Sequence, residues 1–311
     1  MNQPGILIQS RFLVDRLGPL DVPAQVFTPD DIAHGVQPEV ARSVEVLVSG
    51  GEVPNALIDA LPRLRLVACF STGYAGIDIA LLRARGIALT TAAGVNAHDV
   101  ADHAVALLLA LWNGIPVADH LVREGGWRES LIPRRSLRGR SAGVVGLGRT
   151  GLAIARRLAA HELDVSWYGP REKPGIGFDR APSVVALAAQ SDILIISSLA
   201  VPENAGQIDA AVLDALGPQG VLVNVSRGFL VDEVALLAAL RSGGIAGAAL
   251  DVFGQEPLDP AVWRDLPNVV LSPHLAGYTK EAGTDMLTQL RENIRRYFHS
   301  EPLLSPVDGL M

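Results

Sequence analysis

The stretch SAGVVGLGRTGLAIARRLAA, residues 141–160, decides the fold class of this chain. It begins as an apolar run and ends with apolar residues at helical spacing, which predicts a strand, a tight turn and a helix. Within the turn, Gly146, Gly148 and Gly151 form the pattern G-x-G-x-x-G. There the first glycine allows a tight turn, the second lets the backbone approach a pyrophosphate, and the third allows close helix–strand packing. The stretch therefore predicts a dinucleotide-binding turn, and a structural βα turn of another α/β fold is the alternative.

The beginning of the predicted helix supports a phosphate-binding role. The N-terminus of a helix presents free N–H groups and a positive potential, and both favour a bound phosphate. Arg149 and Thr150 follow the second glycine and can add side-chain donors at the same place. We therefore expect Gly146, Gly148, Arg149, Thr150 and Gly151 to bind the pyrophosphate of a cofactor.

Apolar strands and helical segments alternate along the whole chain. Near-continuous apolar strands between Ala- and Leu-rich helices predict parallel sheets that are covered on both faces. The expected strands are residues 6–10, 44–51, 64–72, 86–92, 141–148, 163–169, 191–200, 220–228, 246–253 and 268–276. The fold class is therefore α/β, and 311 residues suffice for two domains of ordinary size.

A long helix predicted over residues 96–112 marks a natural division of the chain, because an irregular Gly-, Pro- and Arg-rich segment separates it from the next strand. The last predicted helix, residues 280–298, can pack back on the first domain. We therefore expect a discontinuous domain of residues 1–100 and 281–311, and a dinucleotide-binding domain of residues 101–280.

Composition disfavours several kinds of partner. The 26 basic and 33 acidic residues give a net charge of −7, and no long basic run is present, so nucleic acid is not an expected partner. The longest apolar stretch, residues 104–112, is too short to span a bilayer, and the N-terminal residues lack a signal-peptide pattern. The single cysteine, Cys69, lies in an apolar run and is interpreted as a buried core thiol. We expect a cytoplasmic protein without a membrane segment or a bound metal.

The stretch WYGPREK, residues 167–173, stands where many dinucleotide-binding proteins place an acidic residue. A carboxylate there accepts hydrogen bonds from the ribose hydroxyls of NAD and repels a 2′-phosphate, whereas an arginine binds that phosphate. Arg171, helped by Lys173, therefore favours NADP(H), and NAD(H) is also possible. Glu172 between the two cations weakens this prediction, and solvated surface charges are the alternative.

Three polar residues directly follow late apolar strands: Arg227 in NVSRG, Glu256 in LDVFGQEP and His274 in LSPHLAG. The carboxyl ends of parallel strands are where ligands bind in open α/β sheets. Reduction of a 2-keto acid needs an arginine to hold substrate oxygens, a protonated histidine to deliver a proton, and a carboxylate to favour and orient the imidazolium. Each residue alone is more often structural, but together with the glycine turn they predict a reductase site.

With these motifs, the sequence resembles the D-isomer-specific 2-hydroxyacid dehydrogenases over nearly its whole length. The resemblance rests on GVVGLGRTG, LGPQGVLVNVSRGFLVDEVALLAAL, IAGAALDVFGQEP and NVVLSPHLAG, which together are highly specific. It implies two Rossmann-like domains with parallel sheets, a flavodoxin-like substrate domain and a dinucleotide-binding domain. It also implies that Arg227, Glu256 and His274 are the catalytic set.

The resemblance assigns further site residues. It implies that residues 70–78, FSTGYAGID, form the substrate loop, in which backbone N–H groups near Thr72, Gly73 and Tyr74 hold the substrate carboxylate together with Arg227. Around the cofactor it implies Val225, Ser226, Asp251, His274 and Gly277 near the nicotinamide, and Ser198 and Leu199 near the adenosine or pyrophosphate.

Within the family, the arrangement is most similar to the NADPH-dependent glyoxylate/hydroxypyruvate reductases and the hydroxyphenylpyruvate reductases. This implies reduction of small 2-keto acids, glyoxylate or hydroxypyruvate, to D-2-hydroxy acids. It also implies a homodimer formed through the helix of residues 99–112 and the irregular segment after it. His98 and His103 in the same helix are not spaced for a metal and are interpreted as structural.

Two departures from the family pattern leave alternatives open. Pro170 stands where relatives that prefer NADPH often have Ser or Thr, and the pair Ala75-Gly76 alters the substrate loop. A reductase of a bulkier 2-keto acid, phenylpyruvate-like or of the D-lactate type, is therefore one alternative. A nucleotide-sensing, corepressor-like binding protein with the same fold is the other.

Overall fold

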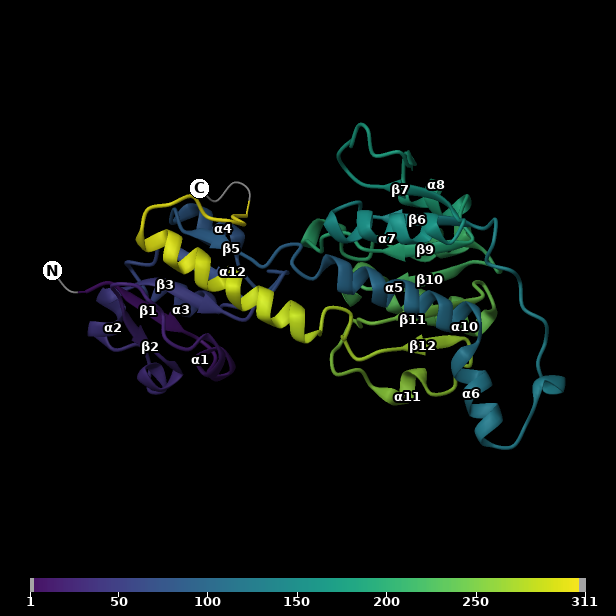
Figure 1. The fold of residues 1–311 in the computed structure, drawn as a ribbon, viewed down its shortest axis with the longest axis horizontal. Helices are drawn as coiled ribbons and strands as arrows, with labels where there is room; N and C mark the ends of the chain where they lie inside the picture. Colours follow the sequence, from purple (N-terminus) through teal and green to yellow (C-terminus); the bar gives the residue numbers. More distant parts are fainter. Residues whose placement is uncertain (1–2, 308–311) are drawn as a thin grey trace. The chain divides into compact units, whose positions relative to one another are not determined.

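The computed structural model describes residues 3–307, and these residues form two compact units (Figure 1). The first unit ends at Asn96 and resumes at Thr279, and the second unit is Ala97–Tyr278. Both units contain one sheet of parallel strand pairs covered by helices. The predicted α/β class with parallel sheets is therefore confirmed.

The first unit contains a five-stranded sheet in the order β2-β1-β3-β4-β5, which is the flavodoxin-like order. Its strands are β1 (Gly5–Ile8), β2 (Gln25–Phe27), β3 (Val44–Ser49), β4 (Leu66–Cys69) and β5 (Ala88–Thr90). Its helices are α1 (Arg11–Leu17), the 3-10 helix η1 (Pro29–Ile32), α2 (Pro38–Ser43), α3 (Asn55–Asp59), α4 (Ile79–Ala84) and α12 (Lys280–Phe298).

Apolar side chains on both faces of this sheet form the core of the first unit, as expected for parallel strands. On one face, Val46 and Leu66 pack with Leu290 and Ile294 of α12. On the other face, Leu47 packs among side chains from α2, α3 and α4. The last helix of the chain is thus a structural element of the first unit.

The thiol of Cys69 lies at the end of β4 and is buried. Burial raises its pKa, although hydrogen bonding with Ser71 acts in the opposite direction. A neutral, buried thiol is a small apolar core residue. The interpretation of Cys69 as a core thiol is confirmed.

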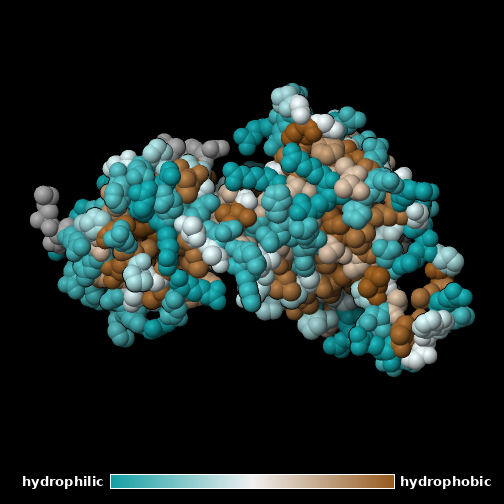
Figure 2. Space-filling view, viewed as in Figure 1, coloured by the Kyte–Doolittle hydropathy of each residue, from teal (hydrophilic) through white to brown (hydrophobic). Residues whose placement is uncertain are grey.

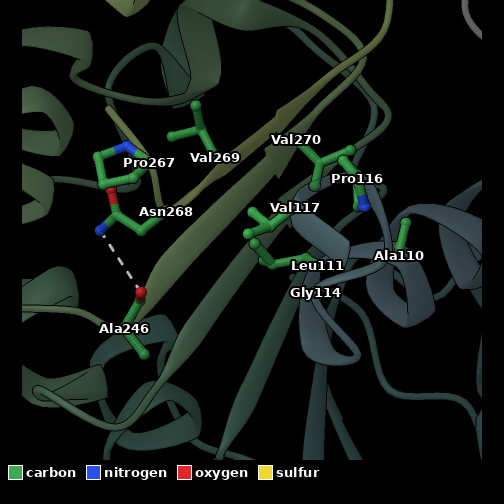
Figure 3. Close-up of a pocket in the computed structure, with 10 residues that line it drawn as sticks. All are labelled: Ala110, Leu111, Gly114, Pro116, Val117, Ala246, Pro267, Asn268, Val269 and Val270. Atoms are coloured by element: carbon green, nitrogen blue, oxygen red, sulfur yellow. Dashed lines mark hydrogen bonds between the residues drawn. The ribbon is translucent and has the colours of Figure 1, made fainter. Parts of the chain in front are cut away.

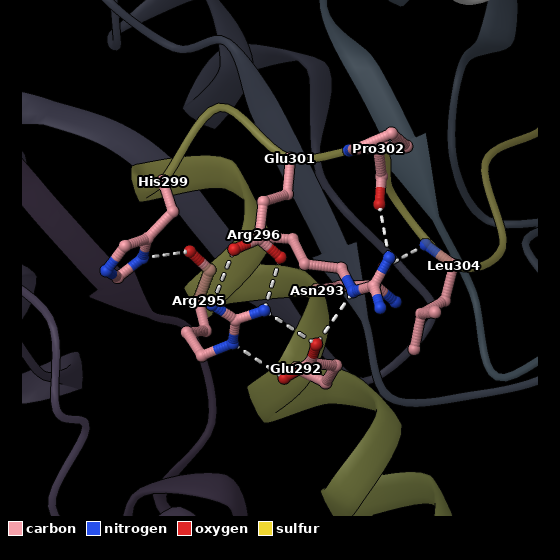
Figure 4. Close-up of polar contacts among 8 residues, drawn as sticks. All are labelled: Glu292, Asn293, Arg295, Arg296, His299, Glu301, Pro302 and Leu304. Carbon is pink, nitrogen blue, oxygen red and sulfur yellow. Dashed lines mark hydrogen bonds and ion pairs between the residues drawn. The ribbon is translucent and has the colours of Figure 1, made fainter.

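An ion-pair cluster ties the end of α12 to the segment after it (Figure 4). Arg295 donates from Nε to Glu292 at 2.8 Å and also pairs with Glu301. Arg296 donates from Nε to Glu292 at 2.7 Å and from Nη1 to the carbonyl oxygen of Pro302 at 2.8 Å. Hydrogen bonds from the two arginines lower the pKa of Glu292 to about 2.

We expect Glu292→Gln to lower the free energy of unfolding at neutral pH. We expect this difference from the wild type to disappear in acid. The pKa of Glu292 is about 2 in the folded protein, whereas a glutamate in an unfolded chain has a pKa of about 4.3. The ionised carboxylate therefore stabilises the fold above about pH 5, and this contribution is lost as the pH falls towards the folded-state pKa.

Urea unfolding of the wild type and Glu292→Gln, at a series of pH values, measures this effect. The difference between the two midpoints should be constant from neutral pH to about pH 5 and should shrink below it. The exposed Asp285→Asn on the same helix is the matched control and should show little difference at any pH. A difference for Glu292→Gln that persists undiminished in acid would contradict a charge-dependent role.

The second unit contains a seven-stranded sheet in the order β12-β11-β10-β9-β6-β7-β8. Counted along this unit, the order is the 3-2-1-4-5-6 arrangement of dinucleotide-binding folds with one further strand at the edge. The strands are β6 (Ser141–Val145), β7 (Asp164–Tyr168), β8 (Asp179–Arg180), β9 (Ile193–Ile196), β10 (Val221–Asn224), β11 (Gly247–Leu250) and β12 (Val269–Leu271). The order reverses between β6 and β9, and ligands bind at such a switch point in open parallel sheets.

Helices cover both faces of this second sheet. Side chains of α5 and α7 pack on one face, and side chains of α8, α9 and α10 pack on the other. The helices are α5 (Ala97–Trp112), α6 (Ile115–Arg123), η2 (Arg128–Ser130), α7 (Arg149–Ala160), α8 (Val184–Ala189), η3 (Pro202–Asn204), α9 (Ala210–Leu216), η4 (Gly228–Leu230), α10 (Glu233–Ser242) and α11 (Pro260–Trp263).

Within residues 3–307, no helix taken singly has both the length and the apolar character needed to cross a membrane. Helices α5 and α6 meet those criteria only as a pair, and a bend of 59° separates them.

Candidate active site

The glycine turn between β6 and α7 has two positions with no room for a Cβ and one that faces open space. Gly146 has a φ of 89°, and a Cβ there would lie 2.4 Å from Cα of Ser198. A Cβ on Gly151 would lie 1.9 Å from the carbonyl oxygen of Gly146. Both positions therefore need glycine, whereas a Cβ on Gly148 would meet no described atom within 4 Å. The turn thus combines two tight backbone contacts with open space beside the start of α7, which fits a pyrophosphate.

Two predicted cofactor residues, Ser198 and Ser226, form a hydrogen bond beside this turn. Ser226 donates from Oγ to the carbonyl oxygen of Ser198 at 2.6 Å, and Gln207 donates from Nε2 to Ser198 Oγ at 2.7 Å. Val225 is buried within the core, while Leu199 is 57% exposed. These residues follow β9 and β10, so the structure brings them to the carboxyl edge of the sheet at the switch point.

Arg180 of the edge strand β8 stabilises the turn after β7 through hydrogen bonds. Arg180 donates from Nη2 at 2.8 Å and from Nε at 3.2 Å to the carbonyl oxygen of Gly169, and it pairs with Glu172 at 3.7 Å. Arg171 and Lys173 are exposed, and neither forms an ion pair within the described part of the chain. The charge of Glu172 is therefore balanced by an arginine that the sequence analysis did not identify.

His274 and Glu256 form a direct pair. His274 has a φ of 55°, a left-handed conformation that histidine adopts more readily than most residues. Its Nδ1 lies 2.7 Å from Oε2 of Glu256, and Oε1 of Glu256 accepts the N–H of Phe253 at 3.0 Å. Because an ionised carboxylate only accepts hydrogen bonds, Nδ1 carries a proton, which leaves Nε2 for a ligand.

Arg227 lies next to this pair because of the glycine that follows it. A Cβ on Gly228 would lie 1.8 Å from the carbonyl carbon of Phe253, so glycine alone permits the close approach of the two loops. Burial lowers the pKa of Arg227, and the negative charge of Glu256 acts in the opposite direction. The three predicted catalytic residues are thus coupled through Glu256 at one edge of the sheet.

Asp251 and Gly277 flank the turn of His274. Asp251 follows β11 and is fully buried, and its carboxylate accepts the backbone N–H groups of Leu275 at 2.8 Å and Ala276 at 2.9 Å. Gly277 is the next residue and is half-buried. Both therefore belong to the same carboxyl edge of the second sheet.

The predicted substrate loop lies in the first unit, after β4. Ser71 donates from Oγ to the carbonyl oxygen of Gly73, and its own carbonyl oxygen accepts the N–H of Ala92 at 2.9 Å. The carbonyl oxygen of Tyr74 accepts the N–H of Ile77 at 3.0 Å. These bonds fix the backbone around Thr72, Gly73 and Tyr74, which are half-buried.

A cavity of about 200 Å³ lies elsewhere in the second unit (Figure 3). It is bordered by α5, α6 and the strand β12, and none of the predicted site residues lines it. The lining is mostly apolar, with an Asn268 side chain that donates to the carbonyl oxygen of Ala246 at 3.4 Å. Over the described residues, no group of three His, Cys, Asp or Glu side chains is placed to hold a metal.

Comparison with known proteins gives consistent matches. The NAD binding domain of D-isomer specific 2-hydroxyacid dehydrogenases matches residues 105–276. Hydroxyphenylpyruvate reductase of Plectranthus scutellarioides is 39% identical over 270 residues, covering 86% of each protein. Glyoxylate/hydroxypyruvate reductase A of Arabidopsis thaliana is 40% identical over 252 residues, covering 81% of this chain and 80% of that protein.

A solved structure matches almost the whole chain. The NADPH-dependent glyoxylate/hydroxypyruvate reductase of Sinorhizobium meliloti, in complex with NADP and malonate, has a TM-score of 0.88 at 37% identity. The match covers 99% of this chain and 98% of that chain. By the family match, the relatives and the fold, this chain belongs to the D-isomer specific 2-hydroxyacid dehydrogenases.

Proposed function

We propose that the protein is an NADPH-dependent reductase that converts small 2-keto acids, such as glyoxylate and hydroxypyruvate, to D-2-hydroxy acids. The observation that carries this proposal is the 2.7 Å pair between His274 and Glu256 with Arg227 beside it. These groups match the needs of ketone reduction: a proton donor, a carboxylate that orients its ring, and a cation for substrate oxygens.

The cofactor is assigned to the carboxyl edge of the second sheet. The reduced nicotinamide, when bound, supplies the hydride for the substrate carbon. We assign the pyrophosphate to the turn of Gly146, Gly148 and Gly151 with Arg149 and Thr150, where the open space beside Gly148 supports the fit. The remaining contacts are assigned to Arg171, Lys173, Ser198, Leu199, Val225, Ser226, Asp251, His274 and Gly277.

In this proposal, the chain's own residues bind the substrate and move one proton. Arg227 holds the substrate through its donor fork, and backbone N–H groups at Thr72, Gly73 and Tyr74 bind the carboxylate. His274 delivers a proton from Nε2 to the keto oxygen, and Glu256 holds the ring through Nδ1. We accordingly infer that the first unit is the substrate domain and the second the cofactor domain.

Initial rates test the proposed activity directly. Glyoxylate, hydroxypyruvate and phenylpyruvate would each be reduced with NADPH and with NADH, and the absorbance of the reduced nicotinamide would be followed. We expect the small keto acids with NADPH to give the highest kcat/KM. A preference for phenylpyruvate would support the bulkier-substrate alternative, and no turnover with any pair would contradict a reductase of these acids.

The preference for NADPH is expected to depend on Arg171. Arg171→Ala should lower kcat/KM for NADPH by about 10- to 100-fold, since a hydrogen bond to a charged group is worth about 1.5–3 kcal/mol. The value for NADH should change by less than about twofold, because its ribose carries no phosphate. The exposed Arg264→Ala in the same unit is the matched control. Equal losses with both cofactors would contradict 2′-phosphate binding by Arg171.

We further propose that the protein is a homodimer and that α6 and the segment after it contact the second copy. Helix α6 buries none of its residues, and Ile115, Val117 and Val122 are each more than half exposed. Trp127 and Ile132 are 63% and 88% exposed, and Figure 2 shows apolar side chains at the surface of this projecting segment. Exposed large apolar side chains gathered on one segment favour a protein partner. Light scattering should give twice the chain mass, and a monomer would contradict the proposal.

A further inference from the structure

A cluster of three polar side chains lies under the turn that carries His274. His103 comes from α5, Asp251 follows β11, and Ser272 follows β12. Nε2 of His103 lies 2.9 Å from Oγ of Ser272 and 3.4 Å from Oδ1 of Asp251, and Ser272 donates its hydroxyl proton to Asp251 Oδ1. Neither His103 nor Ser272 belongs to the proposed catalytic set.

Asp251 stabilises the backbone of the turn around His274 through hydrogen bonds. Its own carbonyl oxygen accepts the N–H of His274 at 2.9 Å, and its carboxylate accepts the next two N–H groups, those of Leu275 and Ala276. Asp251 thus accepts hydrogen bonds from three consecutive backbone N–H groups. Because His274 adopts a left-handed conformation, its backbone depends on surrounding contacts to keep that geometry.

The hydrogen-bond directions define what His103 contributes. The hydroxyl of Ser272 has one proton, and that proton goes to Asp251. Towards His103 the same hydroxyl therefore accepts, so Nε2 of His103 carries a proton and donates it. The fully buried Asp251 carboxylate keeps a fixed orientation only while its donors are in place.

We propose that His103 is a positioning residue for the proton donor His274. It donates from Nε2 to Ser272, this contact orients the Asp251 carboxylate, and Asp251 sets the turn that directs His274 towards Glu256. Helix α5 provides a rigid base for this chain of contacts, since its residues on either side of His103, including Ala101, Ala104 and Leu107, are buried in the core. The proposal rests on the proposed reductase function.

A double-mutant cycle tests the proposal. His103→Leu removes the donor, and we expect kcat to fall about 10- to 100-fold, the range associated with a small misplacement of a reacting group. The dissociation constant for NADPH should change far less than kcat, because the glycine turn and the residues after β9 and β10 are unchanged. If His103 acts through His274, His103→Leu should have almost no further effect in the His274→Gln background, because the two losses share one cause.

Two variants and one structural measurement separate positioning from damage to the fold. His103→Gln keeps an amide donor near the Nε2 position and should recover most of kcat, whereas the exposed His98→Leu on the same helix should behave like the wild type. Hydrogen exchange of the cofactor-free protein should be faster in His103→Leu in the peptide covering residues 272–278, and little changed elsewhere.

The outcomes distinguish the two proposals. A wild type that reduces none of the keto acids would overturn the proposed function. An active wild type with unchanged kcat in His103→Leu would overturn the positioning role. The positioning role would also be overturned if His103→Leu lowered kcat by the same factor in the wild-type and His274→Gln backgrounds. Faster hydrogen exchange across the whole second unit would overturn it as well, and either result would assign His103 to general stability.

Discussion

Replacing His274 with glutamine is expected to lower kcat for 2-keto acid reduction by about 10²- to 10⁴-fold, the usual contribution of a general acid. Glutamine keeps a polar group of similar reach but cannot deliver a proton from Nε2. The dissociation constant for NADPH should change far less than kcat, because His274 is one of many assigned cofactor contacts, and the glycine turn and the residues after β9 and β10 are unchanged. Stopped-flow rates and fluorescence titration with NADPH measure the two quantities.

The supporting carboxylate provides a matched comparison for His274→Gln. Glu256→Gln keeps an acceptor near Nδ1 of His274 but removes the carboxylate charge from this contact. We expect a smaller loss of kcat than for His274→Gln, because the proton donor itself remains. A His274→Gln variant that loses NADPH affinity while keeping kcat would assign the histidine to cofactor binding or structure.

Most of the fold could be predicted from the sequence because buried parallel strands are continuous apolar runs. Each of the ten expected strands contains or overlaps an observed strand, and the expected last helix coincides with α12. The sequence pattern did not indicate strands β2 and β8, which have three and two residues. Both lie at the edges of their sheets and are mostly exposed, so they carry no apolar periodicity that a sequence pattern could reveal.

The site could be predicted where a residue's position follows from its strand. Arg227, Glu256 and His274 each come after an apolar strand, so the topology of a parallel sheet gathers them at one edge. Contacts that depend on three-dimensional packing could not be predicted. His103 lies 169 positions before its partner Ser272, and Arg180 reaches Gly169 from an edge strand that the sequence pattern did not indicate.

The second large effect is expected for Arg227→Ala. Loss of a charged hydrogen-bonding group in a partly desolvated site costs about 2–5 kcal/mol, or roughly 30- to 4000-fold in kcat/KM. Burial lowers the pKa of Arg227, so the guanidinium is already partly stripped of water before substrate binds. We therefore expect a raised KM for the keto acid and a lowered kcat, measured in the same steady-state assay.

Arg227→Lys is the matched control, because it keeps the charge and removes the planar donor fork. If the fork holds the substrate oxygens, lysine should recover only part of kcat/KM, whereas a purely electrostatic role would allow nearly full recovery. Thermal unfolding of both variants is needed as well, since alanine leaves Glu256 without the cation that faces it. An Arg227→Ala protein with wild-type stability and an unchanged KM for the keto acid would contradict the substrate-binding role.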